Sequence, residues 1–167
     1  AIGHGTNNYT TVGLARYVTT IANSGTCYNL TLVDKIENHN SGTVTVHEAE
    51  IRNRIDMDQA YWNAIHAGMR GVVEGKRYFA DLDVNVAGKT GTAQENRNRP
   101  NHALFISYAP YEAPEISVTV RVANGYSSDF AAQIAKEVYE YYYGLKEESE
   151  IITGTAGTLV GGEIGAD

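Results

Sequence analysis

The chain has 167 residues, of which 43% are hydrophobic and 20% charged, an ordinary composition for a globular protein with one core. Lysine and arginine number 13 against 20 aspartates and glutamates, so the formal net charge is -7 and the pI is near 5.2. This balance argues against broad contact with nucleic-acid backbones or acidic membrane surfaces, and a single cysteine, Cys27, excludes an internal disulfide framework.

The first half of the chain predicts a helix, a hairpin and a second helix. Apolar residues recur at helical spacing from Leu14 to Ala22, behind a Thr10 or Thr11 cap and before the stop Asn23-Ser24-Gly25. The β-rich runs Leu30–Ile36 and Thr43–His47 flank turn-forming residues and predict a hairpin. A capping box formed by Asp56 and Gln59 predicts a helix over Met57–Val73.

The second half predicts a meander of three strands followed by a helix. The strands are expected over Val84–Ala93, Ala103–Ala109 and Ile116–Val122, with short connectors that favour antiparallel pairing. A helix over Asp129–Tyr143 should begin at a Ser127 or Ser128 cap, end at Gly144 and bury Phe130, Ile134 and Val138. The charged and Gly-rich residues after 145 predict a flexible tail.

The densest set of functional residue types is Lys89-Thr90-Gly91-Thr92, here named the Lys89–Thr92 motif, in the first strand of the meander. Gly88-Lys89-Thr90 matches the end of a phosphate-binding loop, but that motif needs a glycine where the chain has Asp83 and a helix directly afterwards. The motif also matches the Lys-Thr-Gly strand of serine penicillin-recognising enzymes. A Thr-rich structural strand with one solvated lysine is a third interpretation.

The motif suits the binding of an extended, carboxylate-terminated peptide. Side chains alternate along a strand, so Lys89 and Gly91 should share one face and Thr90 and Thr92 the other. Gly91 permits close approach of a substrate backbone, while the ammonium and hydroxyl groups form a carboxylate receptor at an exposed edge. The backbone N–H of Thr92 is a candidate oxyanion donor, a group worth roughly 2.7 to 4 kcal/mol in comparable sites.

Beyond the motif, residues 1 to about 143 resemble class B penicillin-binding proteins, most closely the elongation type. The resemblance follows the chain in order through these stretches: Ala1-Ile2-Gly3-His4-Gly5, Leu14–Gly25, Ala64–Val73, Asn101–Ile116 and Val122–Gly125. It implies an α+β, partial serine β-lactamase/transpeptidase-like fold in which an antiparallel sheet packs with helices. Residues 1–145 would form the C-terminal part of the transpeptidase domain and 146–167 a flexible tail.

The resemblance also implies a function and a location for the parent protein. The parent would be a serine-type D,D-transpeptidase that cross-links peptidoglycan stem peptides and binds β-lactams, without cofactor or metal. It would act at the extracytoplasmic face of the bacterial cell membrane, anchored by an N-terminal segment outside this chain. Lys89 and Thr92 would have catalytic roles, and Lys89, Thr90, Gly91 and Thr92 would bind the acyl-D-Ala-D-Ala terminus.

The chain departs from the family pattern in its nucleophile. No serine is followed by lysine at the third position and no Ser-x-Asn occurs, so these 167 residues are expected to be inactive alone. Tyr61-Trp62-Asn63 resembles a Tyr-x-Asn motif but precedes the strand, where the family has no catalytic motif, and His4 stands where the family usually has Gln. Without the rest of the domain, the chain should expose part of its core and associate with other copies.

Other interpretations remain open. The parent could be a β-lactam sensor or β-lactamase of the same superfamily, or a non-catalytic module that binds wall peptides. The five histidines show no metal-ligand spacing, and the Tyr141-Tyr142-Tyr143 run is more typical of packing than of a binding platform. Four basic residues flank the motif and are either a positive approach to it or solvated loop charges: Lys76, Arg77, Arg97 and Arg99.

Overall fold

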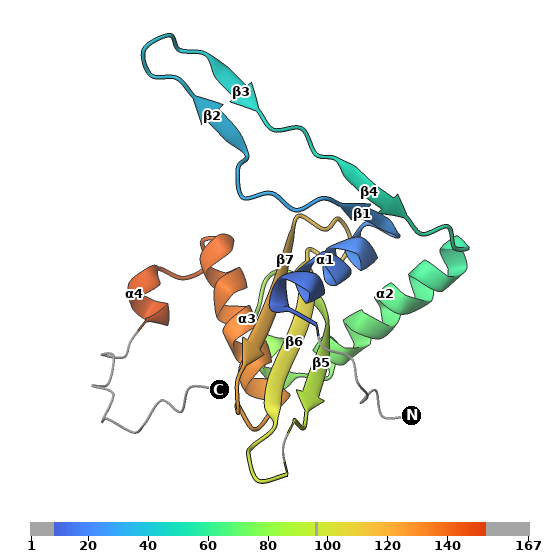
Figure 1. Ribbon diagram of the computed structural model, residues 1–167. Coiled ribbons are helices and arrows are strands. Elements are labelled where there is room, and N and C mark those ends of the chain that lie inside the picture. The colour runs from blue at the N-terminus through green and yellow to red at the C-terminus, as the bar shows by residue number, and fades with distance from the viewer. Residues whose placement is uncertain (1–8, 96, 153–167) are drawn as a thin grey trace.

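The computed structural model describes residues 9–95 and 97–152, which form a three-stranded antiparallel sheet, helices on both of its faces and a projecting arm (Figure 1). The sheet has the order β5-β6-β7, so the predicted meander is confirmed. Its strands are β5 (Ala87–Ala93), β6 (His102–Ala109) and β7 (Ile116–Val122). The first strand begins three residues later than expected.

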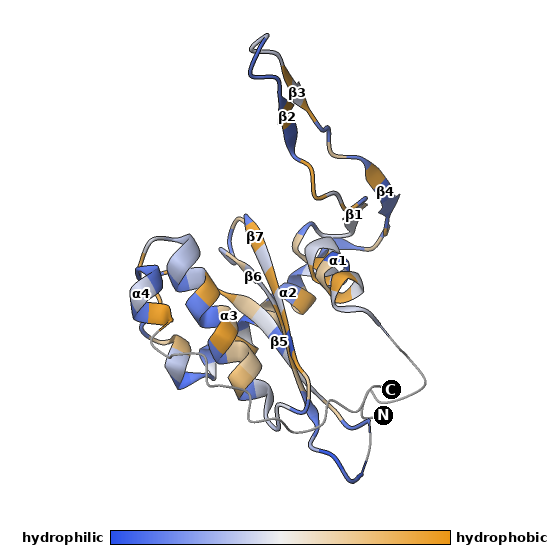
Figure 2. Cartoon of the chain, turned by 60° about the vertical axis from the view of Figure 1, so that its left-hand side comes forward, coloured by the Kyte–Doolittle hydropathy of each residue, from blue (hydrophilic) through white to orange (hydrophobic). Residues whose placement is uncertain are grey.

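Helices cover both faces of the sheet, which lies as the middle layer in Figure 2. The larger helices are α1 (Thr11–Ala22), α2 (Gln59–Glu74) and α3 (Ser128–Tyr142), and η1 (Arg77–Phe79) is a single 3-10 turn. Phe105 of β6 packs towards Tyr139 of α3, whereas Tyr108 packs towards Val18 of α1 and Met69 of α2. Side-chain alternation along β6 thus builds two cores, one on each face, and confirms the α+β class.

The helix starts follow from their caps. The hydroxyl of Thr10 accepts a hydrogen bond from the Gly13 backbone N–H at 3.0 Å, so the predicted start of α1 is confirmed. The predicted capping box of α2 is wrong: Asp58 caps this helix through the backbone N–H of Ala60, at 2.8 Å. Asp58 lies next to the first helical residue, Gln59, within reach of the free N–H groups of the first turn, whereas Asp56 lies three residues before Gln59.

The arm comprises two short antiparallel pairs that leave the body between α1 and α2 (Figure 1). Its strands are β1 (Thr26–Tyr28), paired with β4 (Ile51–Arg54), and β2 (Lys35–Glu37), paired with β3 (Val44–Val46). The predicted hairpin is confirmed, and the Asn38 side chain closes its turn by accepting from the backbone N–H groups of Asn40 and Ser41. The strands are shorter than expected: residues 30–34 lie outside the pair and are exposed to solvent.

The predicted core face of α3 is wrong. The three large side chains on the expected face are partly exposed: Phe130 by 55%, Ile134 by 41% and Val138 by 39%. The residues that are fully buried against the sheet are Tyr139 and three alanines, Ala131, Ala132 and Ala135. Alanine lets the helix backbone approach the strands closely, and the Tyr139 hydroxyl still finds a partner in Ser107, at 2.8 Å. Packing explains Tyr139, while Tyr141 and Tyr142 are exposed.

The last described residues form α4 (Glu148–Ile151), within the stretch expected to be a flexible tail. Lys146 joins this end of the chain to α3 by donating to Glu140 at 2.8 Å. The rest of the expected tail, 153–167, and the predicted loop around His4 lie outside the described residues. Over the part that is described, no helix is long and apolar enough to cross a membrane.

Candidate functional site

The Lys89–Thr92 motif occupies the middle of β5, an edge strand. Within the described ranges β5 pairs with β6 alone, and Lys89 lies opposite Ile106 while Gly91 lies opposite Leu104. Cross-strand neighbours project to the same side, so Lys89 and Gly91 face the α1 and α2 side and the two threonines face the α3 side. The structure therefore brings the four predicted site residues together on one strand at the border of the sheet.

Lys89 carries an ammonium group that is available to an anion. The side chain is exposed, and its Nζ donates to the backbone carbonyl of Thr90 at 2.9 Å. Of the carboxylates in the described residues, none forms an ion pair with it. A charged donor held on its own strand, without a carboxylate partner, is suited to receive a ligand carboxylate.

The two glycines near the motif differ in what the fold demands of them. A Cβ at Gly88 would lie 2.4 Å from the Phe105 ring, so packing requires glycine there. A Cβ at Gly91 would lie 3.3 Å from Leu104 Cβ, a tight contact that a small shift relieves. Packing alone does not explain Gly91, which fits a role in close approach of a ligand backbone.

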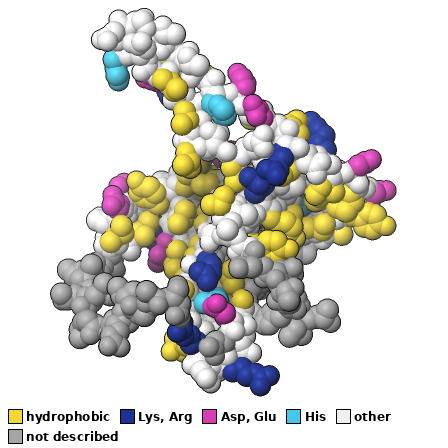
Figure 3. All heavy atoms as spheres, in the orientation of Figure 1, with side chains coloured by type: hydrophobic (Ala, Val, Ile, Leu, Met, Phe, Trp, Pro, Cys, Tyr) yellow, Lys and Arg dark blue, Asp and Glu magenta, His cyan; other side chains and the backbone are white. Residues whose placement is uncertain are grey.

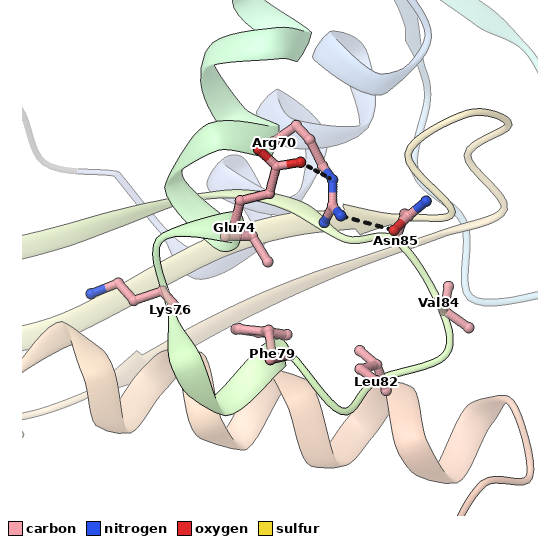
Figure 4. Close-up of a pocket in the computed structure, with 9 residues that line it drawn as sticks. Arg70, Glu74, Lys76, Phe79, Leu82, Val84 and Asn85 are labelled. Atoms are coloured by element: carbon pink, nitrogen blue, oxygen red, sulfur yellow. Dashed lines mark hydrogen bonds and ion pairs between the residues drawn. The ribbon is translucent and has the colours of Figure 1, made fainter.

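Arg70 of α2 holds the start of β5 (Figure 4). Its guanidinium donates to the backbone carbonyl of Val86 at 3.0 Å and to Asn85 Oδ1 at 2.8 Å, and it pairs with Glu74 at 3.3 Å. Asn85 in turn donates to Glu112 Oε1 at 2.6 Å. The planar guanidinium serves several acceptors at once, so the residues before the motif are fixed to a neighbouring helix.

A hollow of about 250 Å³ lies beside this anchor but contains none of the motif residues. Figure 4 shows Phe79, Leu82 and Val84 around it, with Arg70 and Lys76 at its polar rim. Both cations are already engaged, Arg70 as described and Lys76 by Asp129 of α3. The edge of β5 is therefore the better candidate site.

Arg70 and Asn85 carry no sequence signal that could have identified them, because they lie 15 residues apart and share no motif. In the Tyr61-Trp62-Asn63 stretch, Trp62 is buried with Ala87 and Tyr108, whereas Tyr61 and Asn63 are exposed, so only the tryptophan has a packing role. Of the basic residues that flank the motif, Lys76 is held by Asp129, and Arg77, Arg97 and Arg99 are exposed. Nothing in the described structure directs these side chains to the motif.

The two serines of the sheet, Ser107 in β6 and Ser117 in β7, are held in hydrogen bonds within the fold. Ser107 is fully buried, where its hydroxyl accepts from Tyr139 and donates to the Val118 carbonyl at 3.2 Å. Ser117 is bound to Thr19 of α1, at 3.0 Å between the two hydroxyl oxygens. Both hydroxyls are thus engaged in contacts that hold the sheet to its helices and strands.

The chain resembles known proteins across most of its length. Penicillin-binding protein 2A of Bacillus subtilis is 29% identical over 168 residues, which covers 86% of this chain and 23% of that protein. The peptidoglycan D,D-transpeptidase MrdA of Haemophilus influenzae is 40% identical over 103 residues, 50% of this chain and 16% of that protein. The chain thus spans less than a quarter of the length of these relatives.

A solved structure of penicillin-binding protein A from Mycobacterium tuberculosis, an imipenem acyl-enzyme complex, has a similar fold. The TM-score is 0.74 at 26% identity, over 87% of this chain and 33% of that one. The family model described as the penicillin binding protein transpeptidase domain matches residues 1–140. From this match and the shared fold, the chain belongs to the transpeptidase domain family of the class B penicillin-binding proteins.

Proposed function

We propose that the chain is the C-terminal part of the transpeptidase domain of an elongation-type peptidoglycan D,D-transpeptidase, and that the Lys89–Thr92 motif binds the donor stem peptide. The observation that carries the proposal is the exposed Lys89 beside Gly91 on an edge strand. The name D,D-transpeptidase of one relative and the β-lactam acyl-enzyme complex of a structural neighbour support it.

Binding would use the edge of β5 as a template. The acyl-D-Ala-D-Ala terminus lies along this edge as an added strand, and its carboxylate meets the Lys89 ammonium and the threonine hydroxyls. Main-chain hydrogen bonds set the register, while the charged contact selects a free carboxylate terminus. A β-lactam carries a carboxylate and a reactive carbonyl, and it would occupy the same positions.

The chemistry would be acyl transfer to a serine that lies outside this chain. That serine attacks the carbonyl of the penultimate D-Ala, its proton passes to the departing nitrogen, and the peptide bond breaks to release D-Ala. An amine of a neighbouring stem peptide then attacks the acyl-serine and restores the hydroxyl. The Thr92 N–H would face the oxyanion that develops in each step, a contribution of about 2.7 to 4 kcal/mol per donor in comparable sites.

The location follows from the same proposal. Cross-linking of peptidoglycan places the reaction at the extracytoplasmic face of the bacterial cell membrane, with the anchor in a segment outside this chain. Residues 1–145 would be the domain part and 146–167 an appended tail.

Fluorescent penicillin tests the proposal. We expect the longer protein that contains this chain to form a stoichiometric covalent adduct, and the 167 residues alone to form none. In the longer protein, Lys89→Ala should slow acylation about tenfold to hundredfold, because a charge-assisted hydrogen bond contributes about 1.5 to 3 kcal/mol.

The matched control is Lys35→Ala. Lys35 is also exposed on a strand, but it lies on the arm and pairs with Glu37. Equal losses in the two variants would contradict the assigned role of Lys89. A stoichiometric adduct on the 167 residues alone would overturn the claim that the nucleophile lies outside them, and rapid hydrolysis of the adduct would indicate a β-lactamase instead.

A further inference from the structure

His102, the first residue of β6, has a buried ring that contacts two loops of the sheet: the segment after β5 and the turn after β7. It is 8% exposed and lies opposite Ala93, the residue that follows the motif. Its Nδ1 accepts a hydrogen bond from the backbone N–H of Asn124 at 3.0 Å, and its Nε2 lies 2.6 Å from Glu95 Oε2. Because Nδ1 accepts, the ring proton is on Nε2 and is donated to Glu95.

The turn after β7 is fixed against the start of β6. The backbone N–H of Tyr126 donates to the Asn101 carbonyl at 3.0 Å, next to the contact between Asn124 and the ring. Asn124 and Tyr126 have positive φ values of 52° and 62°, and a Cβ on Gly125 between them would lie 2.8 Å from Val122. A non-glycine residue stays in such a conformation only where its neighbours hold it, so this turn is a rigid support for the ring.

The other contact of the ring determines the path of the chain that leaves β5. Glu95 is 77% exposed at its side chain, and the hydrogen bond from His102 holds its pKa below the usual range. An exposed carboxylate has no packing reason to stay at one place, so the bond to the buried ring localises it. The ring thereby links Glu95, three residues after Thr92, to the rigid turn after β7.

We propose that His102 is a positioning residue that fixes the end of β5, where the Thr92 N–H has to face the developing oxyanion. Thr92 pairs with Ala103, the residue directly after His102. A shift of the His102 ring therefore displaces the residue pair next to Thr92 and, with it, the end of the motif. The inference rests on the proposed function and adds a residue to its site. His102 does not touch the substrate in this assignment; it acts through the strand.

The test compares acylation of the longer protein by fluorescent penicillin, with binding and reaction separated by the concentration dependence of the rate. In His102→Ala the first-order acylation constant should fall at least about tenfold, since misplacement by 1 Å costs on the order of a hundredfold. The dissociation constant of the initial complex should change less than threefold, because Lys89 stays in place. Glu95→Ala, at an exposed position, should lower the same constant by a smaller factor.

The matched control is His66→Ala. The ring of His66 is half-buried and also makes a long-range contact, to the Ile21 carbonyl at 2.8 Å, but it joins α2 to α1 away from the end of β5. The His66→Ala substitution should lower the melting temperature without lowering the acylation constant. His102→Asn, whose amide oxygen can accept from Asn124, should recover part of the activity that His102→Ala loses.

A second measurement is independent of activity. Hydrogen exchange of the backbone amide of Asn124 should speed up at least about tenfold in His102→Ala, with no change at Val118 in the middle of β7. An unchanged acylation constant in a folded His102→Ala protein, or an unchanged exchange rate at Asn124, would overturn the inference. Failure of the unsubstituted protein to react would instead refute the proposed function, and the exchange measurement would then judge the role of His102 alone.

Discussion

The sheet of β5, β6 and β7 and the β2–β3 end of the arm are both antiparallel and both rich in β-branched residues, but only the sheet is covered on both faces (Figure 2). Phe105 in β6 is fully buried, whereas Ile36 in β2 is 64% exposed and Val46 in β3 is 57% exposed. Figure 3 shows hydrophobic side chains, in yellow, lying open along the arm. Strand propensity alone therefore does not distinguish a core strand from an exposed one; the covering helices do.

The Lys89–Thr92 motif lies in the sheet, whose two faces are covered by helices, and not in the exposed arm. Its strand is held by β6 along its length and by Arg70 at its start. A carboxylate receptor needs fixed donors, and a strand anchored on several sides supplies them better than a two-stranded arm.

The largest expected effect separates the two regions directly. Phe105→Ala removes a fully buried ring from the sheet and should lower the free energy of unfolding by about 3 to 5 kcal/mol. Val46→Ala on the arm should lower it by less than about 0.5 kcal/mol. Urea unfolding of the two variants gives both values, and similar losses would show that the arm is as well packed as the sheet.

A smaller effect should separate two glycines within the covered region. Gly88→Ala places a methyl group against the Phe105 ring and should destabilise by about 1 to 3 kcal/mol through overpacking. Gly91→Ala meets only the more distant Leu104 and should destabilise less, while slowing acylation by fluorescent penicillin. If Gly88→Ala proved the milder of the two in thermal unfolding, the close contact with Phe105 would not constrain the strand.

The smallest effect concerns an ion pair that joins two elements of the body. A hydrogen bond from Lys76, and to a smaller extent one from Tyr78, lowers the pKa of Asp129 below the 3.8 of an ordinary aspartate. The carboxylate therefore stabilises the fold above this pH, and the contribution is lost as the pH falls through the lowered pKa of the folded state. Asp129→Asn should cost less than about 1 kcal/mol near neutral pH, because the pair is partly exposed.

Urea midpoints measured from pH 7 down to pH 2 test this prediction. The difference between Asp129→Asn and the unsubstituted protein should shrink as the pH falls. The control is Glu37→Gln on the arm, whose partner Lys35 lies on the same strand, so no second element is held. A difference for Asp129→Asn that stays constant over the whole range would assign the effect to packing instead of charge.

Sequence periodicity predicted which elements form but not which side of α3 is buried. The helix has two apolar stripes, one of large side chains that includes Phe130 and Ile134 and one of alanines with Tyr139. Hydrophobicity favours the larger residues, whereas close packing on a sheet favours the smaller ones. Only the distance between helix and sheet decides between them, and no local pattern encodes that distance.

The motif itself could be recognised from the sequence, because its four residues are contiguous. The residues that hold it could not be recognised in that way. Arg70 reaches Val86 from another helix, and His102 meets Asn124 from another connection, so each contact depends on the tertiary fold. The sequence also did not single out His102 as a site residue, because it is one of five histidines and none of them shows a metal-ligand spacing.

The position of Lys89 on an edge strand has one more consequence. An open edge offers backbone groups to any extended chain, including another molecule of the same protein, and natural proteins often place lysine there to prevent aggregation. An exposed ammonium in the middle of β5 opposes the desolvation that pairing between two flat strands requires. The same charge that would attract a short carboxylate-ended peptide thus opposes edge-to-edge pairing of β5 with a strand of another chain.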